Sequence, residues 1–277
     1  MKQRHLRTAL TSFVIPVCFL VAPVFSLGAI GSHAVLSQGL DDVAQRFVAE
    51  RDRVRKEELL EAIVRFPDSG ARLLDIAHST SDLDTKWLAI RGLGRVKYQP
   101  AGRFLIESLK HPHPSVRACA ARAIGDSGLH EAIPALIATL RAEQSGGSVE
   151  QTCLALANLG AREAIPTLKH AAAANAARHS TQTRGWVVQA IGRLGSRDDV
   201  TFLASFLDDN DSFVAVIAAN AIEHITGECF GLPRGEGLQN PSAGIKRARD
   251  WWAQNKEHFH PAVHAARHPL TGHGRQM

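Results

Sequence analysis

The chain has 277 residues, a mass of 30.0 kDa and four cysteines; 45% of its side chains are hydrophobic and 21% are charged. This composition excludes general disorder and a small disulfide-stabilised scaffold. The formal charge is +5, but residues 1–34 carry +3 and residues 246–277 carry +4, which leaves −2 on residues 35–245. Because the body of the chain has no excess of basic side chains, we do not expect nucleic acid as its partner.

The N-terminal segment, residues 1–34, is typical of an export signal. Three basic residues and no acidic one precede an almost wholly apolar stretch, residues 8–30, and small residues suited to signal peptidase follow it. We expect cleavage near Ser32 or Val35 and a periplasmic or secreted protein. The stretch is also long enough to span a bilayer. The alternative is therefore an uncleaved anchor formed by residues 8–30, the one arrangement in which we expect contact with a membrane.

Residues 35–83 are predicted to form an N-terminal helical cap that includes a possible degenerate repeat around residues 59–77. The apolar spacing predicts a helix over Leu40–Phe66, with Val54 on its buried face. The mixed charges between residues 50 and 61 are typical of a solvated helix face. Residues 67–70, Pro-Asp-Ser-Gly, are expected to end this helical segment.

The next part of the chain, residues 84–231, repeats itself. A small residue recurs at one position of each unit, at intervals of 31, 32, 35 and 31 residues, and a large aliphatic residue follows it directly. The small residues are Gly92, Ala123, Ala155, Ala190 and Ala221. A leucine stands 13 residues after each of the first four: Leu105, Leu136, Leu168 and Leu203. We expect the small residues to let neighbouring helices approach closely, and the leucines to fill the core between them.

Each unit holds two apolar stretches of helical period separated by a short polar turn, and strand signals are nearly absent. Pro134 and Pro166 stand where the second helices of two units are expected to begin. The first helices are predicted to open at the N-caps Asp84, Ser115, Ser148, Thr183 and Asp211. Helix pairs that recur every thirty-odd residues predict an all-α fold, a right-handed α-solenoid of about five to six helix pairs.

One unit carries a recognisable motif. The pattern V-R-x-x-A-A-x-A-I-G-x-x-G, which starts at Val116, resembles a HEAT repeat of the short bacterial kind called PBS-lyase HEAT-like. The segments that begin at Glu131 and Glu163 match the second helix of that repeat. The third unit departs from the pattern, with Glu150 where the motif has arginine. The resemblance covers about residues 84–231 and implies helix pairs that stack into a HEAT-like solenoid.

The C-terminal part is expected to close this stack. By resemblance to other bacterial HEAT proteins, residues 232–259 form a C-terminal cap around Trp251 and Trp252. Residues 260–277 are expected to be a flexible tail. Its histidines leave opportunistic metal binding open, since His264 and His268 would share one helix face, but no metal site is predicted there.

No complete catalytic, cofactor or metal site can be assembled from the sequence. The resemblance suggests two enzymatic alternatives, a bilin lyase and the di-iron enzyme deoxyhypusine hydroxylase. The hydroxylase needs several His-Glu pairs, and this chain has one, His130-Glu131. Cys119 and Cys153 fall within apolar stripes, where cysteine acts as a small hydrophobic side chain. We therefore expect a protein without enzymatic activity.

The resemblance implies an exported, non-enzymatic scaffold that binds a protein partner over the surface of its solenoid. The alternative is an accessory subunit that assists an enzyme or a cofactor-loading step. We expect the first helices on the convex side and the second helices on the concave side, with the partner bound by exposed charges of the second-helix row. These charged residues are Arg103, Glu107, Arg141, Glu163, Lys169, Asp199 and Asp208.

Overall fold

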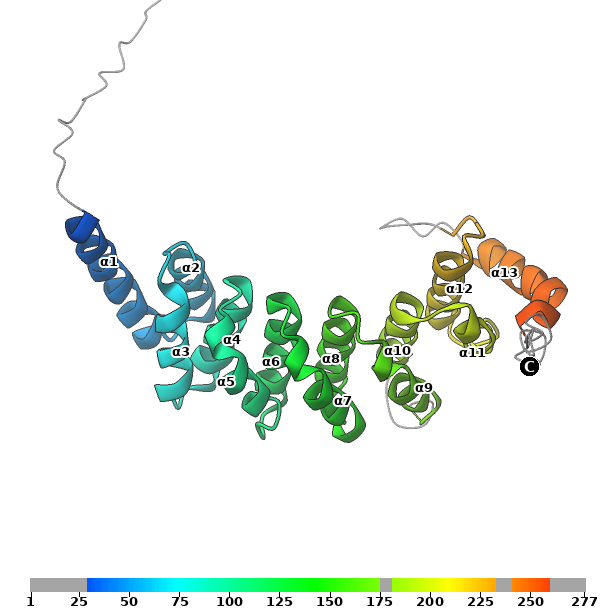
Figure 1. Cartoon of the computed structure of the whole chain (residues 1–277), viewed down its shortest axis with the longest axis horizontal. Coiled ribbons are helices and arrows are strands. Elements are labelled where there is room, and N and C mark those ends of the chain that lie inside the picture. The colour runs from blue at the N-terminus through cyan, green and yellow to red at the C-terminus, as the bar shows by residue number, and fades with distance from the viewer. Residues whose placement is uncertain (1–28, 175–180, 233–240, 260–277) are drawn as a thin grey trace, which may run out of the picture.

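The chain folds into a single curved row of helices (Figure 1). The computed structural model describes residues 29–174, 181–232 and 241–259, and within these ranges it contains thirteen α-helices, five short 3-10 helices and no strand. The predicted all-α solenoid is confirmed. No helix in these ranges is long and apolar enough to cross a membrane. Most of the predicted export segment and the predicted tail lie outside the described residues.

Six helix pairs follow α1 (Ala29–Ala49). Their first helices are α2 (Arg53–Ile63), α4 (Leu83–Arg95), α6 (Pro114–Ser127), α8 (Gly146–Asn158), α10 (Thr181–Leu194) and α12 (Ser212–Thr226). Their second helices are α3 (Ser69–Ser79), α5 (Gly102–Ser108), α7 (Ile133–Ala142), α9 (Ile165–Ala174), α11 (Val200–Ala204) and α13 (Ser242–Asn255). The 3-10 helices are η1 (Gln99–Ala101), η2 (His130–Ala132), η3 (Arg162–Ala164), η4 (Arg197–Asp199) and η5 (Lys256–Phe259).

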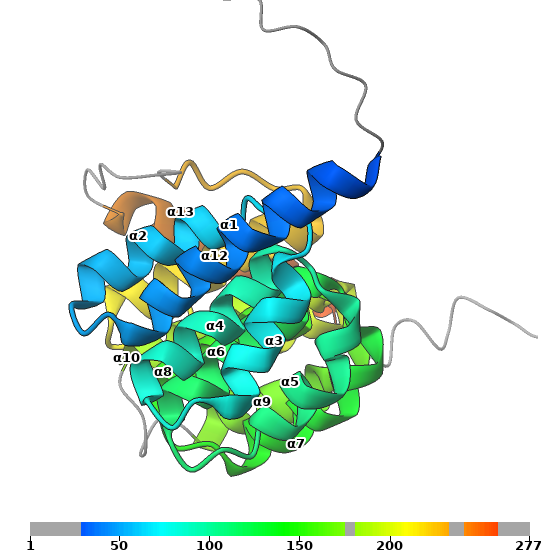
Figure 2. The same cartoon turned by 90° about the vertical axis from the view of Figure 1, so that its left-hand side faces the viewer.

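The pairs form two rows with the core between them. Seen along the stack, α4, α6, α8 and α10 lie on one side and α3, α5, α7 and α9 on the other (Figure 2). The predicted core positions are confirmed, because the following leucines have no exposed surface: Leu105, Leu136, Leu168 and Leu203. Pro134 and Pro166 stand at the second position of α7 and α9, where a missing N–H leaves no hydrogen bond unmade.

Successive first helices touch through small residues at the repeated position. A Cβ atom built on Gly94 would lie 2.6 Å from Cα of Ala123, and one built on Gly125 would lie 2.7 Å from Cα of Ala155. Each glycine stands two residues after the small residue of its own unit and lies against the small residue of the next. The two backbones are therefore so close that no side chain fits between them.

This close approach decides which side of the stack is concave. The first helices pack on one another along their length, whereas most neighbouring second helices make little contact. A stack bends toward the row with the shorter spacing. Figure 1 shows α4, α6, α8 and α10 on the inner side of the bend and α5, α7 and α9 on the outer side. The expectation that second helices line the concave side is therefore wrong, because glycine shortens the spacing of the first helices.

The helix starts show where local sequence is ambiguous. Asp211 is an N-cap as predicted, and its carboxylate accepts the backbone N–H of Phe213 at 2.9 Å. The caps of α4, α6 and α8 are Asp82, His113 and Ser145, two or three residues earlier than expected. The four remaining predicted caps lie inside the first turns of their helices: Asp84, Ser115, Ser148 and Thr183. Several polar residues precede each helix, and backbone geometry selects which one caps it.

The helix predicted over Leu40–Phe66 is instead two helices, α1 and α2, separated by residues 50–52. Glu50 holds this break, because its Oε1 atom accepts the backbone N–H groups of Arg51 at 2.8 Å and of Asp52 at 2.9 Å. The break turns Val54 away from the core, and this side chain is 68% exposed. The predicted buried face of this segment is therefore wrong at Val54.

Candidate functional site

Three ion pairs join successive repeats and position their helices. In each, a basic residue of one first helix contacts an acidic residue in the turn before the next first helix, 25 or 26 positions later. The pairs are Lys56–Asp82 at 2.6 Å, Arg117–Glu143 at 2.6 Å and Arg184–Asp209 at 2.7 Å. Arg117 is the arginine of the HEAT-like motif, so the structure gives this motif residue a role in stacking.

The pKa of Glu143 reflects this role. Burial of the carboxyl by itself raises its pKa, but hydrogen bonds from Arg117, Ser148 and the Ser145 backbone hold the pKa at about 2. Its side chain is only 2% exposed. Lys56 and Thr85 likewise hold the pKa of Asp82 at about 2. These carboxylates are charged throughout the physiological pH range and serve the stack, not a proton-transfer reaction.

Two of the residues predicted to bind a partner are held within the solenoid. Lys169 on α9 lies 2.6 Å from Asp199, whose side chain is 8% exposed and also accepts the backbone N–H of Ser196 at 2.8 Å. A partner would have to break this contact to bind there. Asp208 follows α11 and lies 2.8 Å from Arg249 of α13, but its side chain is 83% exposed and remains accessible.

The other four predicted residues lie on the outer, second-helix row. Arg103 and Glu107 form a pair at 3.0 Å one turn apart on α5, and both side chains are well exposed, at 93% and 61%. Arg141 on α7 donates to Thr167 Oγ1 of α9 at 3.3 Å. Glu163 is exposed in η3. The structure places these residues along one row but does not bring them together into a cluster.

A hollow of about 330 Å³ lies on the opposite, first-helix side, between α4, α6 and α8. Its lining includes Trp87 and Arg91 of α4, Cys119 and Arg122 of α6, and Gln151 of α8. The Trp87 ring has guanidinium groups near it from two helices: Arg53 at 5.0 Å and Arg91 at 5.5 Å from the ring centroid. Such contacts hold an arginine in place without neutralising its charge.

A second hollow of about 450 Å³ lies at the other ends of the same helices and extends to α10. Its polar lining residues are Arg95, Lys97, Asp126, Asn158 and Arg193. Arg193 donates to the Asn158 side chain at 3.0 Å, and Arg95 forms a two-point pair with Glu61 of α2. Together the two hollows are lined by five lysine or arginine residues and two acidic ones, Asp126 and Glu150.

This first-helix face was not among the predicted binding surfaces, although the repeat pattern of the sequence carried a signal for it. In the first two units an arginine stands directly before the small residue: Arg91 before Gly92 and Arg122 before Ala123. Four residues after this position, on the same face of the first helix, each of the first four units carries a polar side chain. These residues are, in order, Arg95, Asp126, Asn158 and Arg193. Polar side chains thus follow the first-helix row through all four units beside the second hollow, and through the first two units beside the first hollow.

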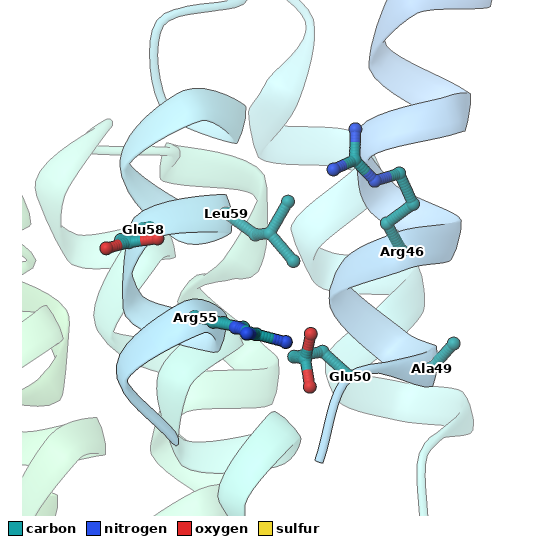
Figure 3. Close-up of a pocket in the computed structure, with 6 residues that line it drawn as sticks. All are labelled: Arg46, Ala49, Glu50, Arg55, Glu58 and Leu59. Atoms are coloured by element: carbon teal, nitrogen blue, oxygen red, sulfur yellow. The ribbon is translucent and has the colours of Figure 1, made fainter. Parts of the chain in front are cut away.

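A third hollow, of about 460 Å³, lies between α1 and α2 (Figure 3). Arg55 points toward Glu50 across it, and Leu59 lies between the two helices. Because Glu50 is already engaged by two backbone N–H groups of the turn, its carboxylate serves the turn first. This hollow involves only the N-terminal end of the stack.

In the described part of the chain, the side chains that could take part in catalysis or bind a metal lie apart from one another. Burial raises the pKa of Cys119 to about 11 and that of Cys153 to about 12, so both thiols stay protonated at neutral pH. His130 and Glu131 are exposed in η2. Among the described residues, no group of three or more His, Cys, Asp or Glu side chains is placed to hold a metal ion.

The chain belongs to the HEAT-repeat family. The family pattern, described as HEAT repeats, matches residues 70–147 and 150–223, which together make up more than half of the chain. The first match begins in α3 and the second ends in α12. No curated protein matches the chain.

Several solved structures are similar in fold. One is the CpcE–CpcF complex of phycocyanin lyase from Nostoc sp. PCC7120, with 18% identity, a TM-score of 0.46, and coverage of 75% of this chain and 94% of that one. An archaeal HEAT-like repeats protein from Thermococcus onnurineus NA1 has 12% identity, a TM-score of 0.48, and coverage of 78% and 97%. Human deoxyhypusine hydroxylase has 19% identity, a TM-score of 0.35, and coverage of 83% and 100%. Identities this low do not transfer an activity.

Proposed function

We propose that this chain is a non-enzymatic scaffold that acts outside the cytoplasm and binds a protein partner along its stack of HEAT repeats. The observation that carries this proposal is the pair of hollows on the first-helix row, to which successive repeats contribute polar side chains at equivalent positions. An extended surface of this kind suits recognition of another chain over several repeats. Export is supported by the basic and apolar composition of residues 1–30 alone.

Two faces of the solenoid are candidates for binding the partner. The second-helix row offers Arg103, Glu107, Arg141 and Glu163, which are exposed on its convex side. The first-helix row offers the two hollows on the concave side, where a partner would contact three or four repeats at once. The first-helix row is the better candidate, because a concave surface buries more of a bound chain than a convex one.

A cross-linked pull-down from the native envelope, with two matched double variants, tests the proposal. We expect a dominant protein to co-purify with the wild type and with Arg103→Glu/Arg141→Glu, and to be lost from Arg91→Glu/Arg122→Glu. Thermal unfolding of all three proteins checks that the stack is intact. Loss only from the second-helix variant would assign the partner to that row. Recovery of a bound metal or coloured small molecule without a protein would contradict the scaffold function.

A further inference from the structure

We propose that the hollow between α4, α6 and α8 binds an extended acidic segment of the partner, with carboxylates spaced about three residues apart. This inference rests on the proposed scaffold function and adds the chemistry of what is bound. The two residues that would receive the carboxylates are Arg91 and Arg122, which line the hollow from successive repeats. Trp87 lies beside them as an aromatic surface.

The ion pairs of these two arginines are looser than those that hold the stack together. Arg122 lies 3.5 Å from Asp126, and Arg91 lies 3.7 Å from Glu57, both beyond ordinary charge-assisted hydrogen-bond length. The inter-repeat pair of Arg117 with Glu143, by contrast, is 2.6 Å long and part-buried. Arg91 and Arg122 can therefore exchange their present neighbours for a partner's carboxylate at little cost.

Both arginines line the same hollow, together with Cys119 of α6. Arg91 is further held by the Trp87 ring, whose Nε1 atom donates to Asp84 at 3.0 Å. An arginine whose position is already restricted loses less entropy when it binds a carboxylate in a two-point contact.

The spacing of the repeats sets the spacing of the ligand. Arg91 and Arg122 occupy the same register on neighbouring first helices, each one residue before the small position. Packed helices lie about 8–10 Å apart. A chain in the extended polyproline II conformation has three residues per turn and advances about 3.1 Å per residue, so carboxylates three residues apart lie on one side of the chain and span about one helix separation. An acidic residue at every third position therefore matches the hollow, whereas adjacent acidic residues point in different directions around such a chain.

Fluorescence anisotropy with the full chain tests this inference. The probe is a labelled twelve-residue peptide made of four Asp-Ser-Gly units. The first control is a peptide of identical composition with its four aspartates adjacent, and the second replaces every aspartate with lysine. We expect saturable binding of the first probe, weakened about tenfold or more by Arg91→Glu/Arg122→Glu and by raising the salt concentration. Arg103→Glu/Arg141→Glu, the matched change on the other row, should leave binding unchanged.

Any of four results would overturn the inference. The first two are a lack of saturable binding by the Asp-Ser-Gly peptide, and equal binding of the control peptide with adjacent aspartates. The other two are equal weakening by both double variants, and tighter binding of a twelve-nucleotide oligothymidine, which would point to a nucleic acid. If the glutamate variant unfolds, Arg91→Gln/Arg122→Gln removes the charges while retaining polar side chains. A co-purified protein that still binds this variant would refute the acidic ligand and leave the scaffold function standing. Absence of any co-purified protein would refute the scaffold function itself.

Discussion

At the scale of single residues, Gly125 shows how little space separates two repeats. A methyl group at this position would meet backbone atoms of Ala155, which cannot move without shifting α8. We expect Gly125→Ala to lower the free energy of unfolding by about 1–3 kcal/mol, in spite of the higher helix propensity of alanine. Urea denaturation monitored by circular dichroism measures the change.

Gly147 provides the matched control for this substitution. It also lies in a first helix, α8, but a Cβ atom built on it has no neighbour within 4 Å. Gly147→Ala should leave stability unchanged or raise it by up to about 1 kcal/mol, because alanine restricts the unfolded chain. Equal losses at both glycines would refute the close backbone contact described here.

The single side chain of Glu143 makes the stability of the folded protein depend on pH. Its pKa of about 2 in the folded protein lies below that of an unfolded glutamate, about 4.3. The ion pair with Arg117 therefore contributes fully above the unfolded pKa, and its contribution disappears as the pH falls from about 4.3 to 2. We expect Glu143→Gln to cost about 2–4 kcal/mol at pH 7 and to flatten the loss of stability below pH 5.

Equilibrium unfolding in urea at pH 7, 5 and 3 measures this pH dependence. Glu107→Gln serves as the control, since its pair with Arg103 is exposed on α5. An exposed pair one helical turn apart contributes only about 0.3–0.5 kcal/mol. If the two substitutions gave the same pH profile, the inter-repeat pair would not have the structural role assigned to it.

At the scale of elements, an arginine of α13 helps to close the last repeat. Arg249 donates to the Leu207 carbonyl from Nε at 3.0 Å and from Nη2 at 2.7 Å, so it holds the end of the α11 segment. We expect Arg249→Met to lower the free energy of unfolding by about 1–2 kcal/mol, because the methionine keeps the apolar stem but loses these hydrogen bonds. Thermal or urea unfolding of the purified chain measures this loss.

Lys246→Met on the same helix is the control for the α13 contact. Among the residues that the structure describes, Lys246 pairs with Asp250 alone, one turn away on the exposed face, at 2.7 Å. Its loss should change stability by less than about 0.5 kcal/mol. A comparable loss at both positions would mean that α13 is stabilised by its own helix propensity and not by docking on α11.

At the scale of the whole molecule, the proposal of export predicts where the mature chain begins. Intact mass spectrometry of the native protein should show a start near Ser32 or Val35, with the protein recovered outside the cytoplasm. Cleavage there would remove the first turns of α1, which spans Ala29–Ala49, and leave α2 to α13 unchanged. An intact Met1 start in a soluble cytoplasmic fraction would refute export, and an intact start in the membrane fraction would support the anchor.

The helix pairs and their core could be predicted from the sequence, because they depend on local periodicity. Leu136 and Leu168 could be placed in the core from spacing alone, and both are fully buried. The N-cap at Asp211 could also be predicted, since it stands just before a long and mostly apolar helix. Such features involve residues close together in the chain, so they can be predicted without knowing which helices pack against them.

The curvature and the position of the candidate site, by contrast, depend on how the repeats pack against one another. Gly94 and Gly125 look like ordinary members of a small-residue motif until they are placed against the next repeat, where they shorten the first-helix spacing and make that side concave. Lys169 and Asp199 looked equally available for a partner, yet they contact each other across two repeats. Each of these outcomes depends on a distance between residues about thirty positions apart, which helix packing sets and local periodicity does not encode.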